Sequence, residues 1–167
     1  MNGTLDPTAA NGTNEAGTPA VRYIQPKKAT NTFNRIVARL TKMGISVWGS
    51  RELRVRGRKT GEWRTTPVNL LTHDGRTYLV APRGTTQWVR NLRADEGRGE
   101  LRLGRNVDAF TAVELADADK VDVLRAYLKR WKMEVGVFFD GVDAKASDEE
   151  LLAIAPGYPV FGIEIAA

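Results

Sequence analysis

The sequence predicts a mainly β, α+β fold, in which a small barrel of five or six antiparallel strands carries helices on its outside. Three observations support this prediction. Segments rich in Val, Leu, Thr and aromatic residues, typical of strands, follow one another between residues 47 and 115. Short glycine-containing connections separate several of these segments, so neighbouring strands are expected to run antiparallel. Amphipathic segments with helical spacing lie on both sides of the β-rich region.

The first 20 residues are almost devoid of large apolar side chains. Such a segment cannot bury enough surface to offset the entropy lost on ordering. We therefore expect residues 1–20 to be a disordered tail and residues 21–167 to form a single domain. The chain contains no cysteine, no apolar run of membrane-spanning length and no secretory signal, which favours a cytoplasmic location.

A helix is expected at 30–44, where apolar residues recur at helical spacing and arginines and a lysine lie away from that stripe. Its apolar side is expected to pack on the sheet, although a basic amphipathic helix also allows peripheral contact with an anionic membrane. Further helices are expected at 84–94 and 117–132. The expected strands are 47–55, 63–72, 76–82, 100–103, 107–115 and 159–165.

Conventional catalytic side chains are scarce in this sequence. The chain has one histidine, His73, no cysteine and no G-x-S-x-G motif, so a histidine or cysteine metal site and a serine triad have no support. We name no catalytic side chain and no metal ligand. If the protein is an enzyme, a cofactor is expected to carry the chemistry.

The clearest positive signal is the basic segment RVRGRKTGEWR at 54–64. Gly57 and Gly61 allow a tight hairpin whose backbone N–H groups can converge on an anion, and Arg58 and Lys59 add cations there. The segment is not a P-loop, because Glu62 follows Gly61. The net charge of +5 fits either an anionic ligand or simple solubility, and a merely solvated basic hairpin stays an alternative.

The segments GRKTGEWRTTPVNLL, TYLVAPRG, WVRNLRA and YPVFGIEI together resemble the deazaflavin (F420)-dependent nitroreductase family of oxidoreductases. The similarity covers about residues 45–115 and the last strand. It implies a split β-barrel related to FMN-binding oxidases. It also implies an enzyme that uses reduced coenzyme F420, an anionic molecule with a phosphate and a polyglutamate tail, to deliver hydride to a quinone, an enone or a nitro compound.

The resemblance also assigns residues to the site. The basic hairpin would hold the phosphate end of the coenzyme, and later segments would lie beside its ring. The residues assigned to the coenzyme are Arg58, Lys59, Thr60, Gly61, Arg64, Pro67, Val80, Ala81, Pro82, Arg83, Gly84, Trp88, Asn91 and Leu92. Asn69, Trp131 and Phe138 are expected to line the substrate pocket, where this chain departs from the tyrosines of the family.

Three alternatives stay open at this point. The same fold could use FMN, or it could hold a cofactor or lipid without turnover. Nucleic-acid binding is disfavoured, because Trp63 is the one aromatic residue interleaved with the arginines of the hairpin. The expected partner is a small-molecule substrate, and the protein is expected to be a monomer or a homodimer.

Overall fold

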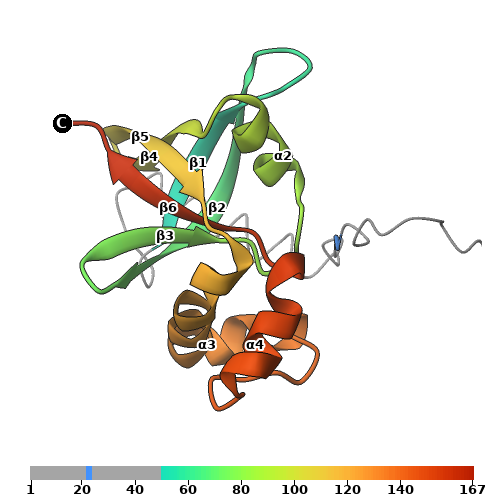
Figure 1. Ribbon diagram of the computed structural model, residues 1–167. Helices are drawn as coiled ribbons and strands as arrows, with labels where there is room; N and C mark the ends of the chain where they lie inside the picture. The colour runs from blue at the N-terminus through green and yellow to red at the C-terminus, as the bar shows by residue number, and fades with distance from the viewer. Residues whose placement is uncertain (1–21, 24–49) are drawn as a thin grey trace, which may run out of the picture.

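Six antiparallel strands form the body of the molecule. They are β1 (Ser50–Arg56), β2 (Trp63–His73), β3 (Arg76–Val80), β4 (Arg98–Leu103), β5 (Asn106–Glu114) and β6 (Val160–Ile165). They close into a barrel in the order β1-β2-β3-β6-β5-β4, with β4 pairing back to β1 (Figure 1). The computed structural model describes residues 22–23 and 50–167, so the expected tail at 1–20 and the helix at 30–44 lie outside the described residues. The predicted antiparallel barrel with outer helices is confirmed.

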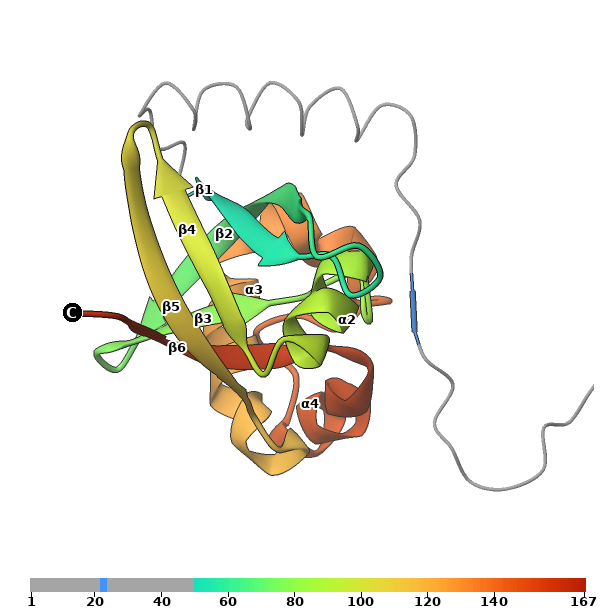
Figure 2. The same ribbon diagram turned by 90° about the horizontal axis from the view of Figure 1, so that it is seen from above.

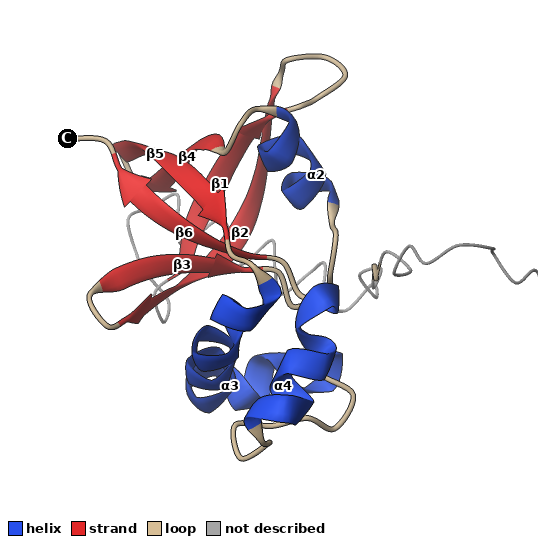
Figure 3. Ribbon diagram, viewed as in Figure 1, coloured by secondary structure: helices blue, strands red, loops and turns tan. Residues whose placement is uncertain are grey.

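The helices lie outside the barrel (Figure 3). They are α2 (Gln87–Ala94), α3 (Val121–Val135) and α4 (Asp148–Ile154), with short 3-10 turns η1 (Asp117–Lys120), η2 (Gly136–Phe138) and η3 (Ala155–Gly157). The predicted helix at 84–94 begins later, because Gly84 has a φ of +81°, outside helical geometry. No helix in the described part of the chain is both long and apolar enough to cross a bilayer.

Alternate strand residues point into the barrel and form its apolar core. Val89 and Leu92 of α2 pack onto this core, and both are fully buried. The core consists of Leu53, Val55, Leu79, Ala81, Val89, Leu92, Leu101, Phe110, Ala112, Phe161 and Ile163.

A second apolar cluster joins the outer barrel surface to α3 and α4, which lie together on one side of the barrel (Figure 2). Tyr78 and Val80 flank the inward-facing Leu79 and therefore point outward, into this cluster. Phe139 and Tyr158 stack within it, with ring centroids 4.3 Å apart and planes 6° apart. The Tyr158 hydroxyl donates a 2.5 Å hydrogen bond to the Phe138 carbonyl.

Gly97, between α2 and β4, is required for both its conformation and its lack of a side chain. Its φ is +79°, and a Cβ there would lie 2.1 Å from the Ala112 carbonyl oxygen. Gly75 has nearly the same φ, +73°, with nothing within 4 Å of the Cβ position. Gly75→Ala should cost about 1–2 kcal/mol of unfolding free energy, whereas Gly97→Ala should cost clearly more. Denaturant unfolding of both variants measures the difference, and equal losses would contradict the clash.

Burial raises the pKa of Tyr158 to about 12. The unfolded chain releases this proton near pH 10, so the folded state binds it more tightly. The stabilisation is therefore present below pH 10 and is lost as pH rises toward 12. The melting temperature should fall steeply across that window in the wild type and less steeply in Tyr158→Phe. Parallel slopes for the two proteins would contradict this assignment.

Candidate functional site

The basic hairpin between β1 and β2 is closed by its own backbone. Gly57 N–H donates to Glu62 O at 2.8 Å, and Thr60 and Gly61 N–H donate to Gly57 O at 3.2 and 2.7 Å. Glu62 N–H donates to Thr60 Oγ1 at 3.3 Å, and Arg58 N–H also has a protein acceptor. Five N–H groups of the hairpin, those of Gly57, Arg58, Thr60, Gly61 and Glu62, therefore already have acceptors within the protein. The side chains of the hairpin thus have more capacity to bind an anion than its backbone has.

Arg58 fastens the hairpin to α2. Asn91 Oδ1 accepts from the Arg58 backbone N–H at 3.2 Å and from Arg58 Nη1 at 2.8 Å. Gln87 Oε1, one turn earlier, accepts from the same Nη1 at 3.0 Å. Asn91 is 5% exposed, so its amide is fixed by packing as well as by these bonds. The structure thus brings together two residues assigned to the coenzyme, Arg58 and Asn91, and makes Asn91 a support for the hairpin.

The other cations of the hairpin have different surroundings. Arg56 donates to Gly61 O at 3.2 Å, and its guanidinium lies 3.9 Å from the Trp63 ring centroid. Arg64 pairs with Glu62 at 3.1 Å. Lys59 is exposed and has no ion-pair or hydrogen-bond partner among the described residues. Lys59 is therefore the hairpin cation most available to a ligand.

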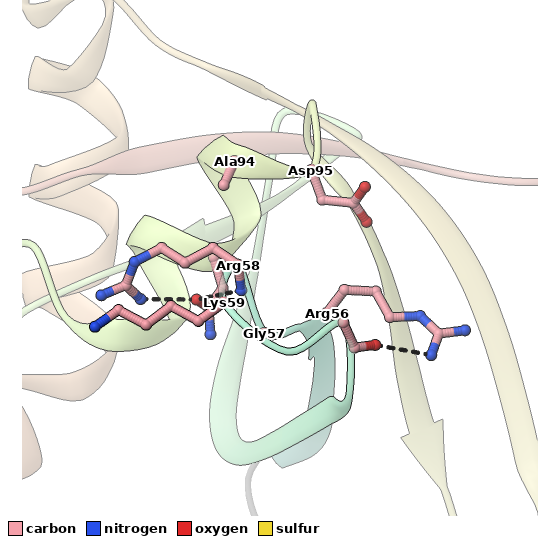
Figure 4. A pocket seen from close by; sticks show the side chains of 8 residues that line it. Arg56, Gly57, Arg58, Lys59, Ala94 and Asp95 are labelled. Atoms are coloured by element: carbon pink, nitrogen blue, oxygen red, sulfur yellow. Dashed lines mark hydrogen bonds between the residues drawn. The ribbon is translucent and has the colours of Figure 1, made fainter.

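A pocket of about 430 Å³ lies between the hairpin and the C-terminal half of α2. Figure 4 shows Arg58 and Lys59 extending in one direction and Arg56 in the other. Asp95 is the one carboxylate of its lining, and Arg98 pairs with it at 2.9 Å. The lining consists of Arg56, Gly57, Arg58, Lys59, Gly61, Asn91, Ala94 and Asp95. Three cations against one paired carboxylate give this pocket a net positive charge, which favours anions.

Sequence reasoning missed Gln87 and Asp95. An acid at the end of a helix opposes the helix dipole. Asp95 at the end of α2, followed by Glu96, therefore carried a signal that such a residue has a specific role or partner. Gln87 carried no comparable signal, because only the packing of the hairpin on α2 reveals its contact.

The turn before α2 is a second place where predicted residues gather. Burial lowers the pKa of Arg83, and the nearby Tyr23 phenol partly offsets this effect. Thr86 occupies the N-cap position without a side-chain cap hydrogen bond, and its buried Oγ1 has no partner. The predicted anion contact at this helix start stays a prediction. Pro82, like Arg83, is half-buried here.

Several residues assigned to the coenzyme have side chains that lie in the core. Ala81 and Leu92 are fully buried and Val80 is nearly so. The side chains of Ala81 and Leu92 are fully buried in packing, and a contact of these residues with the coenzyme stays a prediction. Trp88 is half-buried and lies against Phe161, with ring centroids 5.9 Å apart. Its edge is the one aromatic surface of α2 that a ligand could reach.

The residues expected at the substrate pocket do not form one group. Trp131 is 3% exposed and packs, with Phe138, in the outer cluster under α3 and α4. Trp131 faces this cluster because it belongs to the apolar stripe at helical spacing on α3, and its contact with a substrate stays a prediction. Asn69 and Pro67 are half-buried on β2, opposite Ser50 and Glu52 of β1. They point to the same face of the strand, and their contact with a substrate stays a prediction.

The site offers binding rather than acid–base chemistry. Within residues 22–23 and 50–167, no group of three His, Cys, Asp or Glu side chains could hold a metal ion. His73 lies at the β2–β3 turn, where its Nε2 is 3.4 Å from Asp74.

Comparisons with known proteins give a consistent result. The sequence profile of the F420H(2)-dependent quinone reductase family matches residues 27–144. No curated protein matches the sequence significantly. A solved F420-H2 dependent reductase (FDR-A) is 17% identical with a TM-score of 0.50, covering 70% of this chain and 94% of its own. A second solved structure, described as a domain-swapped dimer, is 19% identical with a TM-score of 0.51, covering 81% of this chain and 96% of its own. At these identities the solved structures show the shared fold alone.

Replacing Asn91 tests the attachment of the hairpin to α2. Asn91→Leu keeps the approximate volume but leaves the Arg58 backbone N–H without its acceptor, so it should cost about 1–3 kcal/mol of unfolding free energy. Asn91→Asp keeps both accepting interactions and should cost much less. Denaturant unfolding measures the cost, and hydrogen exchange at residues 57–61 should rise only in the leucine variant. Equal behaviour of the two variants would contradict the proposed attachment.

Proposed function

Since this chain belongs to the F420H(2)-dependent quinone reductase family, we propose that it holds reduced coenzyme F420 at the pocket between the β1–β2 hairpin and α2 and reduces a quinone. The family membership makes the protein a reductase that depends on this coenzyme. The proposal adds the place of binding and the acceptor. The observation that carries it is the pocket itself, lined by Arg56, Arg58 and Lys59.

The residues present fit the charge of the coenzyme. Its phosphate and its polyglutamate tail are anionic, and the pocket presents three cations. Arg58 is held by neutral amides, Asn91 and Gln87, so its contacts fix its position without cancelling its charge. Lys59 adds an ammonium group without a partner in the described structure. The volume of about 430 Å³ lies in the usual range for small-molecule sites, roughly 300–1,000 Å³.

When bound, the reduced deazaflavin supplies the hydride that the acceptor receives. The tasks left to this chain are to bind, orient and exclude water. Arg58 and Lys59 would hold the anionic end, while Asn91 and Gln87 keep Arg58 in place. Trp88 and the end of the barrel core would provide an apolar surface. We assign no proton donor, in keeping with the scarcity of acid–base side chains at the pocket.

A quinone is the acceptor we favour, and enones and nitro compounds are the alternatives. We place the reaction in the cytoplasm and expect a monomer or a homodimer. The test is to mix the purified protein with reduced coenzyme F420 and a panel of quinones, enones and nitro compounds, and to follow the absorbance of the oxidised coenzyme. Turnover of quinones supports the proposal. Saturable coenzyme binding without turnover of any acceptor would contradict it.

Replacing Lys59 tests the binding role of the hairpin separately from stability. Lys59→Gln should raise the coenzyme Kd about tenfold, the size expected for one charge-assisted contact. The kcat at saturating coenzyme should stay nearly unchanged, since the contact is the same in ground and transition states. Lys129→Gln on the exposed side of α3 is the matched control and should change neither. A large loss of kcat with unchanged affinity would overturn this role for Lys59.

A further inference from the structure

Arg22 connects a short N-terminal segment to two distant parts of the fold. Its Nη1 lies 2.5 Å from Asp140 Oδ2, and its Nη2 donates to the Phe138 carbonyl. The guanidinium also lies over the buried Tyr158 ring, 4.9 Å from its centroid. The Arg22 side chain is 25% exposed, whereas that of Asp140 is 70% exposed. Arg22 is therefore anchored to η2 and η3 at the edge of the helical layer.

The backbone of the same residue holds the turn that leads into α2. Thr85 N–H donates to Arg22 O at 2.7 Å, and Tyr23 forms an antiparallel bridge with Gly84. A Cβ on Gly84 would lie 2.0 Å from Arg22 O, so only glycine permits this close approach.

Hydrogen bonds link the turn at 83–86 to α2 and so to the proposed site. Thr86 N–H donates to Gly84 O at 2.8 Å, and Arg90 N–H, in the first turn of α2, donates to Thr86 O at 3.1 Å. Gln87, the first residue of α2, accepts from Arg58 Nη1. A displacement of the turn would therefore move an acceptor that holds Arg58 in the pocket.

We propose that Arg22 is a positioning residue for the coenzyme site, through its hold on the turn at 83–86. It touches neither the pocket nor its lining, and it lies outside the region 27–144 that matches the family. This inference rests on the proposed function, because it takes the pocket beside α2 as the place where the coenzyme binds. Its consequence is that loss of the Arg22 anchor weakens coenzyme binding without removing any ligand contact.

Arg125 provides a matched control. Its guanidinium donates to the carbonyls of Ala144 and Ala146 at 2.9 and 2.6 Å and pairs with Asp148 at 2.5 Å. It is thus bonded like Arg22, to backbone carbonyls and one aspartate, and its side chain is 31% exposed. None of these contacts reaches the turn at 83–86. Arg125→Ala should lower stability as Arg22→Ala does, without changing the pocket.

The experiment measures three quantities in wild type, Arg22→Ala and Arg125→Ala. These are the melting temperature, the coenzyme Kd by calorimetry, and hydrogen exchange at residues 83–87. Both variants should melt lower. Only Arg22→Ala should exchange faster at 83–87 and bind the coenzyme more weakly, by about fivefold to tenfold. Arg22→Lys keeps the positive charge opposite Asp140 but loses the planar guanidinium. Its coenzyme Kd and its exchange rate at 83–87 should lie between those of the wild type and Arg22→Ala.

The outcomes separate this inference from the proposed function. If the wild type binds the coenzyme and Arg22→Ala binds it equally well, the inference fails and the proposed function stands. If Arg22→Ala and Arg125→Ala weaken binding equally, the effect is general destabilisation and the inference also fails. If the wild type shows no coenzyme binding, both fail. Should Arg22→Ala not fold, Asp140→Asn weakens the same anchor more gently, and the same rise in Kd is expected on a smaller scale.

Discussion

The packing of α2 onto the barrel core is the interaction on which the rest of the site depends. Val89 and Leu92 are fully buried there, and burial of each such side chain contributes about 1.5–3 kcal/mol. An eight-residue helix is not stable by itself in water, since helices of this length gain too little to offset nucleation. Its existence therefore requires the barrel interior beneath it. Once the apolar side of α2 is buried in the barrel, the direction in which its polar residues Gln87 and Asn91 point is fixed.

That polar side explains how a basic hairpin can be ordered and still attract anions. The acceptors on α2 that hold Arg58 are the neutral amides of Gln87 and Asn91. A carboxylate at position 91 would hold the hairpin equally well but would cancel the charge. Neutral acceptors order the guanidinium in advance, so less side-chain entropy is lost when a ligand binds. Lys59, on the same hairpin, is exposed and has no partner among the described residues, so one hairpin cation is held in place and the other is not.

The sequence predicted features that depend on neighbours along the chain. Strand alternation and the turn at Asp74-Gly75 are local signals, and the barrel follows from them. Features that depend on distant partners were not predictable. The hairpin N–H of Arg58 is bonded 33 residues away, to Asn91, so no local pattern showed that the loop backbone would be occupied. The burial of Trp131 followed a local signal, its place on the apolar stripe of α3, whereas its distance from a bound substrate depends on distant partners.

Viewed along the chain, residues 83–91 are held from three directions by physically different interactions. The barrel core packs against the apolar side of α2, the hairpin hydrogen-bonds to its polar side, and the backbone of Arg22 restrains the turn before it. Hydrophobic packing holds α2 against the barrel but is not directional, so it would allow the helix to slide or rotate. Hydrogen bonds are directional and fix the orientation of the helix. The two together define the position of a short helix that neither could define alone. In the proposed function, this restraint of α2 would keep Arg58 and Asn91 in position beside the coenzyme pocket.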